Sequence, residues 1–511
     1  MTNTEYRTFD GGNNNLDNAD WGKANTPLLR TTTPDYADES ASLAVRGPKN
    51  PNPREVSNQI CQQTGSFPNP NQLSDFVWAW GQFLDHEIDL TGQVDDEVVN
   101  ITTPDDDPVL QGATIPFRRS LHDPCSGTGS NNPRQQINQI SAYIDATNVY
   151  GSSVERANAL RAFDGTGRLK TSAADVGEML PYNVSGIEND ALPNMQTSEL
   201  YVAGDVRANE NAVLTCMHTL FVREHNRLCL DIVTCAPDLL GNDEAVFQQA
   251  RAIVSGLMQS ITFNEFIPVL MGQGALTPYT GYRKNVNASV ANVFSTAAYR
   301  LGHSMLSSTI RLGTEGRSVA LRDAFFKPLL VNLYGIEPFL SGLAVQVMQD
   351  IDAQVIDDVR NFLFGPPSQE NRHLLDLPAL NIQRGRDHGL PGYNRCREEY
   401  GLARLCDFSD LTKNKELQRK LKHLYKDVDH VDPWVGGLVE DHLAGANMGA
   451  FVFAVLKDQF ERLRDGDRFW YQNDPALSLE QQIEIDNTRL ADIIRRNTSI
   501  SDIPDNIFVV N

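Results

Sequence analysis

The stretch WGQFLDHEID, residues 80–89, decides how this sequence is interpreted. Helical periodicity across residues 73–89 predicts an α-helix, and the helix places four polar side chains on one face at i, i+3, i+4 and i+7: Gln82, Asp85, His86 and Asp89. A helix usually buries an apolar stripe there. Taken alone, a histidine flanked by acids also suits a solvated or hydrogen-bonded structural role. The alternative is a pocket in which the imidazole acts as a general acid and base.

Helical patterns continue through most of the chain. Between residues 209 and 230, apolar side chains recur on one side and predict a central core helix: Leu214, Met217, Phe221 and Leu228. Further helices are expected at 243–270, 289–306, 347–363 and 444–464, whereas strand patterns are scarce. Residues 1–70 are loop-like and rich in Asn, Pro, Thr and Gly. The sequence therefore predicts a mainly α fold, with a single large helical domain at 71–511 and a loop-rich N-terminal arm at 1–70.

Composition narrows the class of protein. Apolar residues make up 41% and charged residues 22% of the 511 positions, which is ordinary globular usage. The 44 basic and 66 acidic residues give a net charge of −22, so nucleic acid is not an expected partner. No run approaches the ~18 to 20 apolar residues of a membrane span, and Met1–Asn14 lacks the pattern of a secretory signal.

The seven cysteines leave at least one unpaired in a monomer. Cys229 with Cys235, or Cys396 with Cys406, would close short loops, and the sequence leaves open whether either disulfide forms.

Four more polar segments stand out. Arg207 and Glu210 open the central helix at i and i+3, where a surface ion pair is the ordinary explanation. RLGH, residues 300–303, places a histidine in an apolar helix, and such a histidine is commonly a core residue. NIQRGRDHG, residues 381–389, is a dense polar run that also suits a solvated loop. SAYIDAT, residues 141–147, alternates oxygen-bearing and apolar side chains, a weak but suitable pattern for calcium.

Together and in this order, these five segments resemble the animal haem peroxidase family, part of the peroxidase–cyclooxygenase superfamily. The resemblance runs from about Leu73 to the C-terminus and also includes YGS at 150–152, REHNRL at 223–228, LPGYN at 390–394 and LRDGDRFW at 463–470. It implies a mainly α-helical fold with haem b buried in a helical core. Explanations that suit each segment in isolation do not account for this density of matches.

The resemblance implies a role for three residues above the haem. His86 matches the distal histidine, which takes a proton from bound peroxide and returns it to the departing oxygen. Arg207 matches the distal arginine, which stabilises the negative charge that develops as the O–O bond breaks. Gln82 matches the distal amide that holds water or a halide beside them.

Other matches concern the cofactor. His303 matches the proximal iron ligand, and Asn381 matches the partner that accepts its other ring N–H. Arg300 and Arg384 match the residues that pair with the haem propionates. Asp85 and Glu210 match the carboxylates that form ester links to haem methyl groups, so the resemblance implies a covalently bound haem. Asn211 stands where one member of the family has a methionine that forms a third, sulfonium link, so that link is not expected.

Calcium is the second cofactor that the resemblance implies. The family loop is matched by Ser141, the carbonyl of Tyr143, Asp145 and Thr147. Glu87 stands where the mammalian members have an aspartate, and its extra methylene is expected to shift or weaken coordination. Because Glu87 follows His86 directly, loss of calcium should disturb the distal side of the haem.

The resemblance implies an enzyme that reduces hydrogen peroxide to water through a ferryl intermediate. Expected electron donors are small anions and aromatics, namely iodide, bromide, thiocyanate and phenols. A fatty-acid oxygenase is the first alternative. A cyclooxygenase carries a radical-forming tyrosine three residues before the proximal histidine, and Arg300 stands at that position here. Tyr299 lies one residue further back, on a different side of the helix, so the oxygenase is disfavoured. An adhesive or binding protein with the same fold is the second. The resemblance implies that the protein acts outside the cell. The sequence leaves its oligomeric state open.

Overall fold

The computed structural model describes residues 5–193, 195–363 and 375–510. Its α-helices are α1 (Pro53–Val56), α2 (Phe76–Ile88), α3 (Thr147–Tyr150), α4 (Val154–Leu160), α5 (Ala212–Cys235), α6 (Asp243–Ile261), α7 (Ile267–Met271), α8 (Pro328–Tyr334), α9 (Glu337–Val345), α10 (Asp357–Arg360), α11 (Leu377–Asp387), α12 (Tyr393–Glu399), α13 (Phe408–Leu411), α14 (Lys415–Tyr425), α15 (Pro433–Val439), α16 (Ala450–Asp465), α17 (Leu479–Asn487) and α18 (Leu490–Asn497). Segments of π-helix are η1 (Ser57–Cys61), η4 (Thr262–Phe266) and η5 (Phe294–Ala298). Segments of 3₁₀-helix are η2 (Thr197–Glu199), η3 (Pro237–Leu239), η6 (Tyr299–Ser304), η7 (Leu321–Asp323) and η8 (Val428–His430). The predicted mainly helical fold is confirmed.

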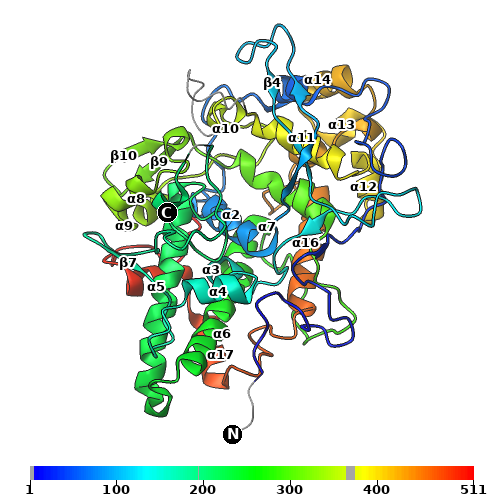
Figure 1. Cartoon of the computed structure of the whole chain (residues 1–511). Coiled ribbons are helices and arrows are strands. Elements are labelled where there is room, and N and C mark those ends of the chain that lie inside the picture. The colour runs from blue at the N-terminus through cyan, green and yellow to red at the C-terminus, as the bar shows by residue number, and fades with distance from the viewer. Residues whose placement is uncertain (1–4, 194, 364–374, 511) are drawn as a thin grey trace.

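Strands in the described residues are short and pair two by two, in antiparallel ladders. The pairs are β1 (Thr26–Pro27) with β6 (Ile137–Asn138), β2 (Gln93–Val98) with β5 (Arg118–Ser120), β3 (Ile101–Thr102) with β4 (Thr114–Ile115), β7 (Ser172–Ala174) with β8 (Gly177–Met179), and β9 (Thr309–Leu312) with β10 (Arg317–Ala320). In the register, Thr26 faces Asn138 and Arg317 faces Leu312. In Figure 1 the labelled strands β4, β7, β9 and β10 lie at the edge of the helical body.

The central helix predicted from residues 209–230 is α5, Ala212–Cys235. Asn211 caps its N-terminus, because the Asn211 side chain accepts a hydrogen bond from the backbone N–H of Leu214. Nearly every side chain of its first three turns is buried, as befits a helix enclosed on all sides. Figure 1 shows α5 running beside α6, against which it packs.

The helix Asp243–Met271, formed by α6, η4 and α7 in succession, is long and apolar enough to cross a membrane by length and composition. In this molecule 72% of the most apolar 18-residue stretch of this helix is buried inside the protein. The helix is therefore a core helix that packs on α5 and on α17.

Two helix predictions need correction. Across 347–363 the structure has α10 (Asp357–Arg360), and most of the preceding residues are extended. Val347, Gln349 and Val355 form isolated bridges with Ser74, Pro68 and Gln62, so pairing with a distant segment overrides the local pattern. Across 289–306 the chain is π-helical and then 3₁₀-helical in η5 and η6, not a regular α-helix.

The N-terminal segment contains few regular elements before α2, and its side chains reach far along the chain. Arg7 pairs with Asp467, and buried Arg54 pairs with Asp107 and Asp376. One large hydrophobic core takes in residues from Leu28 to Phe508, consistent with a single domain. All seven cysteines are free thiols, so neither candidate disulfide is formed.

Candidate active site

A cavity of about 290 Å³ lies in the middle of the molecule, between α2 and η6. We call it the central cavity. Its lining comes from α2, the segment that precedes α5, η4, α7, η6, η7 and the segments around α10 and α11: Val77, Trp78, Gly81, Gln82, Asp85, His86, Arg207, Glu210, Asn211, Phe266, Leu270, Tyr299, Arg300, Leu301, Gly302, His303, Met305, Leu306, Leu321, Phe325, Val359, Leu363 and Leu377. Segments more than 200 residues apart thus bring His86 and His303 to one space.

His86 lies on the α2 wall and is 3% exposed. Its Nδ1 is 3.6 Å from Asp205 Oδ1, and its Nε2 is 3.6 Å from Glu210 Oε2. Burial, and after it the positive charge of Arg207, holds the pKa of His86 well below its usual value. The imidazole is therefore neutral near pH 7, the state that a general base requires.

Arg207 is held by Asp205, a residue that the sequence analysis did not single out. The Nε and Nη2 of Arg207 donate to the two carboxylate oxygens of Asp205 at 2.9 and 2.7 Å. Nη2 also donates to the carbonyl of Asp89. Nη1 makes no hydrogen bond within the described ranges and lies 3.9 Å from Asp85 Oδ2. Asp205 therefore fixes both the guanidinium plane and the environment of His86 Nδ1.

Gln82 connects Glu210 to the start of α5. The Gln82 Nε2 donates to Glu210 Oε1 at 3.1 Å, and the Asn211 Nδ2 donates to Gln82 Oε1 at 2.8 Å. This bridge fixes the orientation of the Gln82 amide at the cavity wall. Asn211 thus has two roles, as the cap of α5 and as the anchor of Gln82.

Two carboxyl groups of the cavity wall have raised pKa values. Desolvation raises the pKa of Asp85 to about 7, with the nearby carboxyl of Asp89 adding to the effect. Desolvation likewise raises the pKa of Glu210 to about 7, against the opposing effect of Arg207. Both groups are therefore partly protonated near neutral pH in the haem-free protein.

His303 lines the same central cavity as His86, from η6. Desolvation, with a smaller contribution from Arg300, lowers its pKa to about 3, so the ring is neutral and able to bind a metal. The Asn381 Nδ2 donates to His303 Nδ1 at 2.7 Å, and Asn381 Oδ1 accepts from Arg300 Nη1 at 3.1 Å.

This orientation of Asn381 differs from the expected one, in which the amide accepts the ring N–H. Arg300 occupies the amide oxygen, so the nitrogen faces the ring. Coordination through His303 Nε2 requires the ring proton on Nδ1, and the Asn381 amide would then have to present its oxygen instead.

The two expected propionate partners differ in position. Arg300 lines the central cavity. Arg384 does not line it; its Nη1 donates to the carbonyl of Arg118, to Ser120 and to Asp387. The match of Arg384 to a propionate partner therefore stays a prediction.

The residues present fit a haem group. The central cavity lies between two neutral histidines and carries many apolar side chains, which suit a flat porphyrin. His86 Nδ1 is buried without a hydrogen-bond partner among the described residues. A Cβ added at Gly302, beside His303, would meet no atom within 4 Å, so the backbone leaves open space next to the expected ligand.

The predicted calcium residues are partly assembled beside α2. Both carboxylate oxygens of Glu87 accept backbone N–H bonds, from Asp145 at 2.6 Å and Asn148 at 2.8 Å. Ser141 donates to Asp145 Oδ2 at 2.7 Å. Burial, followed by repulsion from Asp145, raises the pKa of Glu87 well above its usual value. Two buried carboxyls that repel each other fit a divalent cation, although backbone amides already use the Glu87 oxygens.

Comparisons with known proteins identify the family of the chain. The family model "Animal haem peroxidase" matches residues 6–508. Peroxinectin A of Dictyostelium discoideum is 36% identical, over 99% of this chain and 96% of its own length. Eosinophil peroxidase of Homo sapiens is 35% identical, over 99% of this chain and 77% of its own length.

Among solved structures, peroxidase A from Dictyostelium discoideum superposes with a TM-score of 0.90 at 34% identity, covering 99% of this chain and all of that one. A fatty acid alpha-dioxygenase of Arabidopsis thaliana superposes with a TM-score of 0.80 at 20% identity, over 99% of this chain and 83% of the other. At that identity the likeness shows a shared fold alone.

Proposed function

Because the chain belongs to the animal haem peroxidase family, we propose that it reduces hydrogen peroxide in the central cavity. In this proposal His86 and Arg207 act on the peroxide from one wall, and His303 holds a haem iron at the other wall. The observation that carries this proposal is that two neutral histidines, from α2 and from η6, line one cavity together with Arg207. The chain is an oxidoreductase that acts on peroxide, as the family and the named relatives indicate.

When bound, haem supplies an iron that binds peroxide and stores the two oxidising equivalents released by O–O cleavage. His303 would hold that iron through Nε2, and Asn381 would orient the ring. On the opposite wall, the neutral His86 takes the proton of the incoming peroxide and later gives it to the departing oxygen. The Nη1 of Arg207, which has no other hydrogen bond in the described chain, stabilises the charge that develops on that oxygen.

We further propose that Asp85 and Glu210 form ester links to the haem. Both carboxyls line the central cavity. Each ester would join a carboxyl oxygen to a haem methyl carbon, with loss of the carboxyl hydrogen and one methyl hydrogen, and one hydrogen peroxide would take up these two hydrogens and two electrons to become two water molecules. The position of Asn211 offers no sulfur for a third link. Calcium bound by Glu87, Ser141, the Tyr143 carbonyl, Asp145 and Thr147 would stabilise the segment that follows His86.

Expected electron donors are iodide, bromide, thiocyanate and phenols, and we expect the protein to work outside the cytoplasm. The net charge of the chain is −22, which by itself repels small anions. Arg207 and Arg300 line the central cavity and supply the local positive charge that supports access for small anions.

An absorption spectrum of the haem-loaded protein, recorded before and after addition of hydrogen peroxide, tests the proposal. A Soret band that shifts with peroxide is expected in the wild type. His303→Ala should lose haem or change its spectrum, and His86→Ala should keep the band but react with peroxide at least about 100-fold more slowly. His423→Ala, on the exposed face of α14, is the matched control.

Absence of a Soret band after reconstitution would reject the haem proposal. Acid-acetone extraction of the same samples tests the esters: haem should resist extraction from the wild type and become extractable from the double variant Asp85→Asn, Glu210→Gln. Haem that extracts freely from the wild type would reject the ester links alone.

A further inference from the structure

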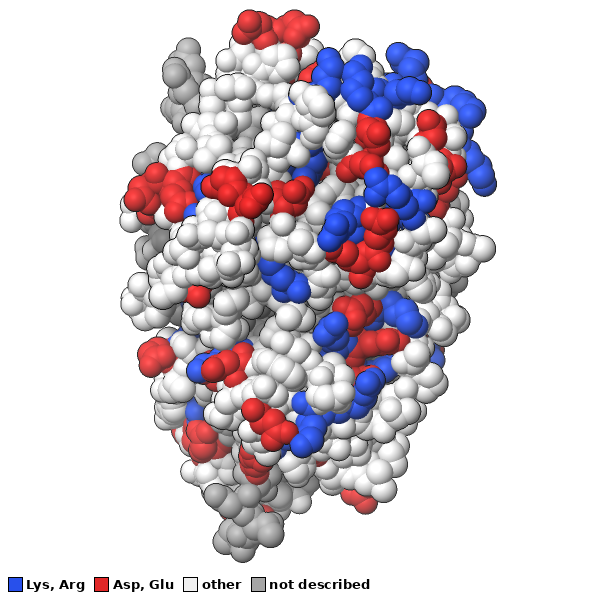
Figure 2. Space-filling view, turned by 90° about the vertical axis from the view of Figure 1, so that its right-hand side faces the viewer, with Lys and Arg blue, Asp and Glu red and all other residues white. Residues whose placement is uncertain are grey.

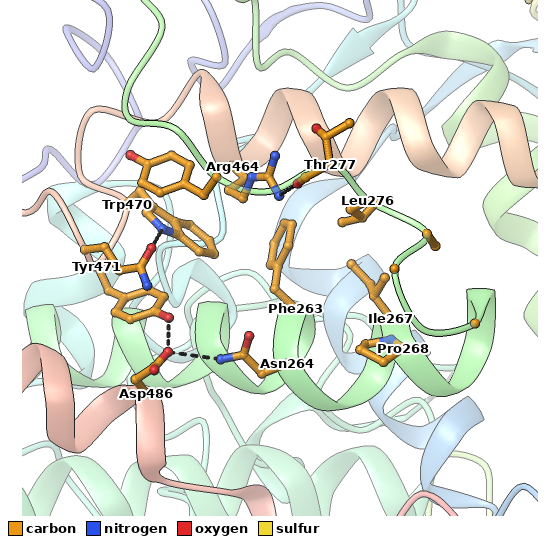
Figure 3. Close-up of a pocket in the computed structure, with 15 residues that line it drawn as sticks. Phe263, Asn264, Ile267, Pro268, Leu276, Thr277, Arg464, Trp470, Tyr471 and Asp486 are labelled. Carbon is orange, nitrogen blue, oxygen red and sulfur yellow. Dashed lines mark hydrogen bonds between the residues drawn. The ribbon is translucent and has the colours of Figure 1, made fainter.

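A second pocket, of about 240 Å³, is shown in Figure 3. We call it the ring pocket. Its lining includes four aromatic side chains and two charged ones: Phe263, Tyr279, Trp470, Tyr471, Arg464 and Asp486. The helical segment η4–α7 forms the partition between the two spaces: Phe263 and Ile267 line the ring pocket, whereas Phe266 and Leu270 line the central cavity.

The ring pocket is aromatic around Trp470. The Trp470 ring lies 4.9 Å from that of Phe263, 5.7 Å from that of Tyr279 and 4.9 Å from that of Tyr471, between centroids. Indole and phenol are the protein side chains that lose an electron most readily. The ring pocket therefore combines a space for a small ring with three oxidisable side chains.

A continuous series of ring contacts joins Trp470 to the central cavity. From Trp470 to Phe263 the centroid distance is 4.9 Å, from Phe263 to Phe460 it is 6.0 Å, and from Phe460 to Tyr299 it is 5.9 Å. Tyr299 lines the central cavity, and its hydroxyl donates to the carbonyl of Gly81 on the helix that carries His86. Because electron transfer weakens steeply with gaps between groups, these packed rings favour electron transfer along this route.

The charges of the ring pocket select an uncharged occupant. Arg464 pairs with Asp465, whose Oδ1 accepts from Arg464 Nε at 2.7 Å, and the Nη1 of Arg464 donates to the carbonyl of Thr277. The Nη2 of Arg464 is buried without a hydrogen-bond partner among the described residues, so it can donate to a phenol oxygen. Asp486 forms no ion pair within the described ranges, and its Oδ1 accepts from Tyr471 and Asn264, as Figure 3 shows. A carboxylate without a counter-charge repels iodide or thiocyanate but accepts a hydrogen bond from a phenol.

We propose that the ring pocket binds a single-ring, uncharged phenol and that Trp470 passes the phenol's electron through Phe263, Phe460 and Tyr299 to the haem. This inference rests on the proposed peroxidase function. Trp470 gives one electron to the oxidised haem and takes one electron from the phenol. The phenol also releases its hydroxyl proton, to Asp486 or to water. Two phenols become two phenoxyl radicals while one hydrogen peroxide, two electrons and two protons become two water molecules.

Guaiacol and iodide, compared as donors of the haem-loaded protein, test the route. Trp470→Phe keeps a ring in place but removes the indole, so guaiacol oxidation should fall at least tenfold while iodide oxidation stays unchanged. Phe460→Leu interrupts the ring contacts away from both cavities and should have the same effect. Trp21→Phe, the same change outside the ring series, should leave both activities intact.

Two readouts are independent of turnover. After peroxide is added in the presence of a spin trap, mass spectrometry should locate the adduct on Trp470 in the wild type and Trp21→Phe, and not in Trp470→Phe. Calorimetric titration of haem-free protein with guaiacol should detect binding that Asp486→Asn weakens and Phe460→Leu does not.

The proposal is overturned if Trp470→Phe and Phe460→Leu oxidise guaiacol at the wild-type rate, or if guaiacol binding is unaffected by Asp486→Asn. Neither of these results contradicts the proposed peroxidase function, because iodide oxidation would be unaffected. Absence of both iodide oxidation and the Soret band would instead reject the proposed function, and this electron route with it.

Discussion

At the residue scale, the side chains that the sequence identified best are those whose chemistry is rare in a helix core. His86, Arg207 and His303 stood out by pattern and resemblance, and the structure places all three on the central cavity. Asp205 was missed because an aspartate in a loop, two residues before an arginine, is an ordinary surface feature in a sequence. Only its position, 2% exposed and bonded to Arg207, reveals it.

Asp205 offers a sharp test of how the distal wall is organised. Asp205→Asn keeps the size of the side chain but removes the charge that holds Arg207, so the guanidinium should lose its fixed orientation. We expect the rate of the reaction with peroxide to fall at least about tenfold. Stopped-flow recording of the Soret band measures this rate.

Asp164→Asn, at an exposed loop position, is the matched control and should react like the wild type. A positioning role requires that haem content and the midpoint of thermal unfolding of Asp205→Asn stay close to wild type, and that Asp205→Glu recover part of the rate. An unchanged rate in Asp205→Asn would show that Arg207 needs no such partner.

At the element scale, long helices with a clear apolar side could be predicted, and segments fixed by distant partners could not. The pattern at 209–230 gave α5, whose core side chains repeat at helical spacing. At 347–363 a similar local pattern failed, because Val347 and Gln349 pair with residues near 70. Local periodicity contains no information on such a partner.

The helix α5 is expected to make the protein sensitive to acid. His218 and His225 are fully buried in it, and burial lowers the pKa of each to about 4. In the unfolded chain the pKa is about 6.5, so between pH 6.5 and 4 the unfolded state binds more protons. Stability should therefore fall as the pH is lowered through this window, by about 2 kcal/mol per histidine between pH 6.5 and 5.

Urea unfolding of the haem-free protein at pH 7.0 and 5.0 measures the effect. His225→Gln retains an amide that can bond to Tyr150 and to the Gly167 carbonyl, which His225 contacts. It should lose less stability between the two pH values than the wild type. His423→Ala, exposed on α14, should show the wild-type dependence. Equal losses in His225→Gln and wild type would contradict the prediction.

The segment after α2 gives a prediction on metal removal. If Glu87 and Asp145 hold calcium, the purified protein should contain about one calcium per chain, and a chelator should lower its thermal unfolding midpoint by several degrees. Added calcium should restore the midpoint, and magnesium should not, because magnesium demands a stricter octahedral geometry.

Elemental analysis by mass spectrometry, with differential scanning calorimetry, measures both effects. Asp145→Asn should abolish the response to chelator, and Asp164→Asn should retain it. A midpoint that the chelator leaves unchanged would indicate that the backbone amides bonded to Glu87 replace the metal.

At the scale of the whole molecule, a strongly negative chain still presents mixed surfaces. Figure 2 shows one face on which acidic and basic side chains are intermingled, with basic groups gathered near the top of the view, at the height of α14 in Figure 1. The net charge of −22 therefore did not predict that acidic and basic side chains are mixed on this face. The composition also did not reveal how the N-terminal segment is attached, because Asp467, which pairs with Arg7, and Asp376, which pairs with Arg54, lie hundreds of residues away.

Arg54 links the N-terminal segment to the site. It is completely buried, and it donates to Asp107 and to Asp376 at 2.7 Å each. Asp376 in turn caps α11, where its side chain accepts from the backbone N–H of Ala379. Since α11 carries Asn381, the bonding partner of His303, the buried ion pairs of Arg54 fix the helix that orients the proximal histidine.

Arg54→Met would remove the cation and leave two buried carboxylates uncompensated, which costs about 3 to 5 kcal/mol. The midpoint of urea unfolding should therefore fall markedly, whereas Lys23→Met, which breaks an exposed pair with Asp20, should change stability by less than about 1 kcal/mol. In folded Arg54→Met protein at low temperature, the haem spectrum should also change, because α11 is no longer held at its cap. A midpoint as little affected as that of Lys23→Met would mean that the N-terminal segment is held by packing and not by this charge cluster.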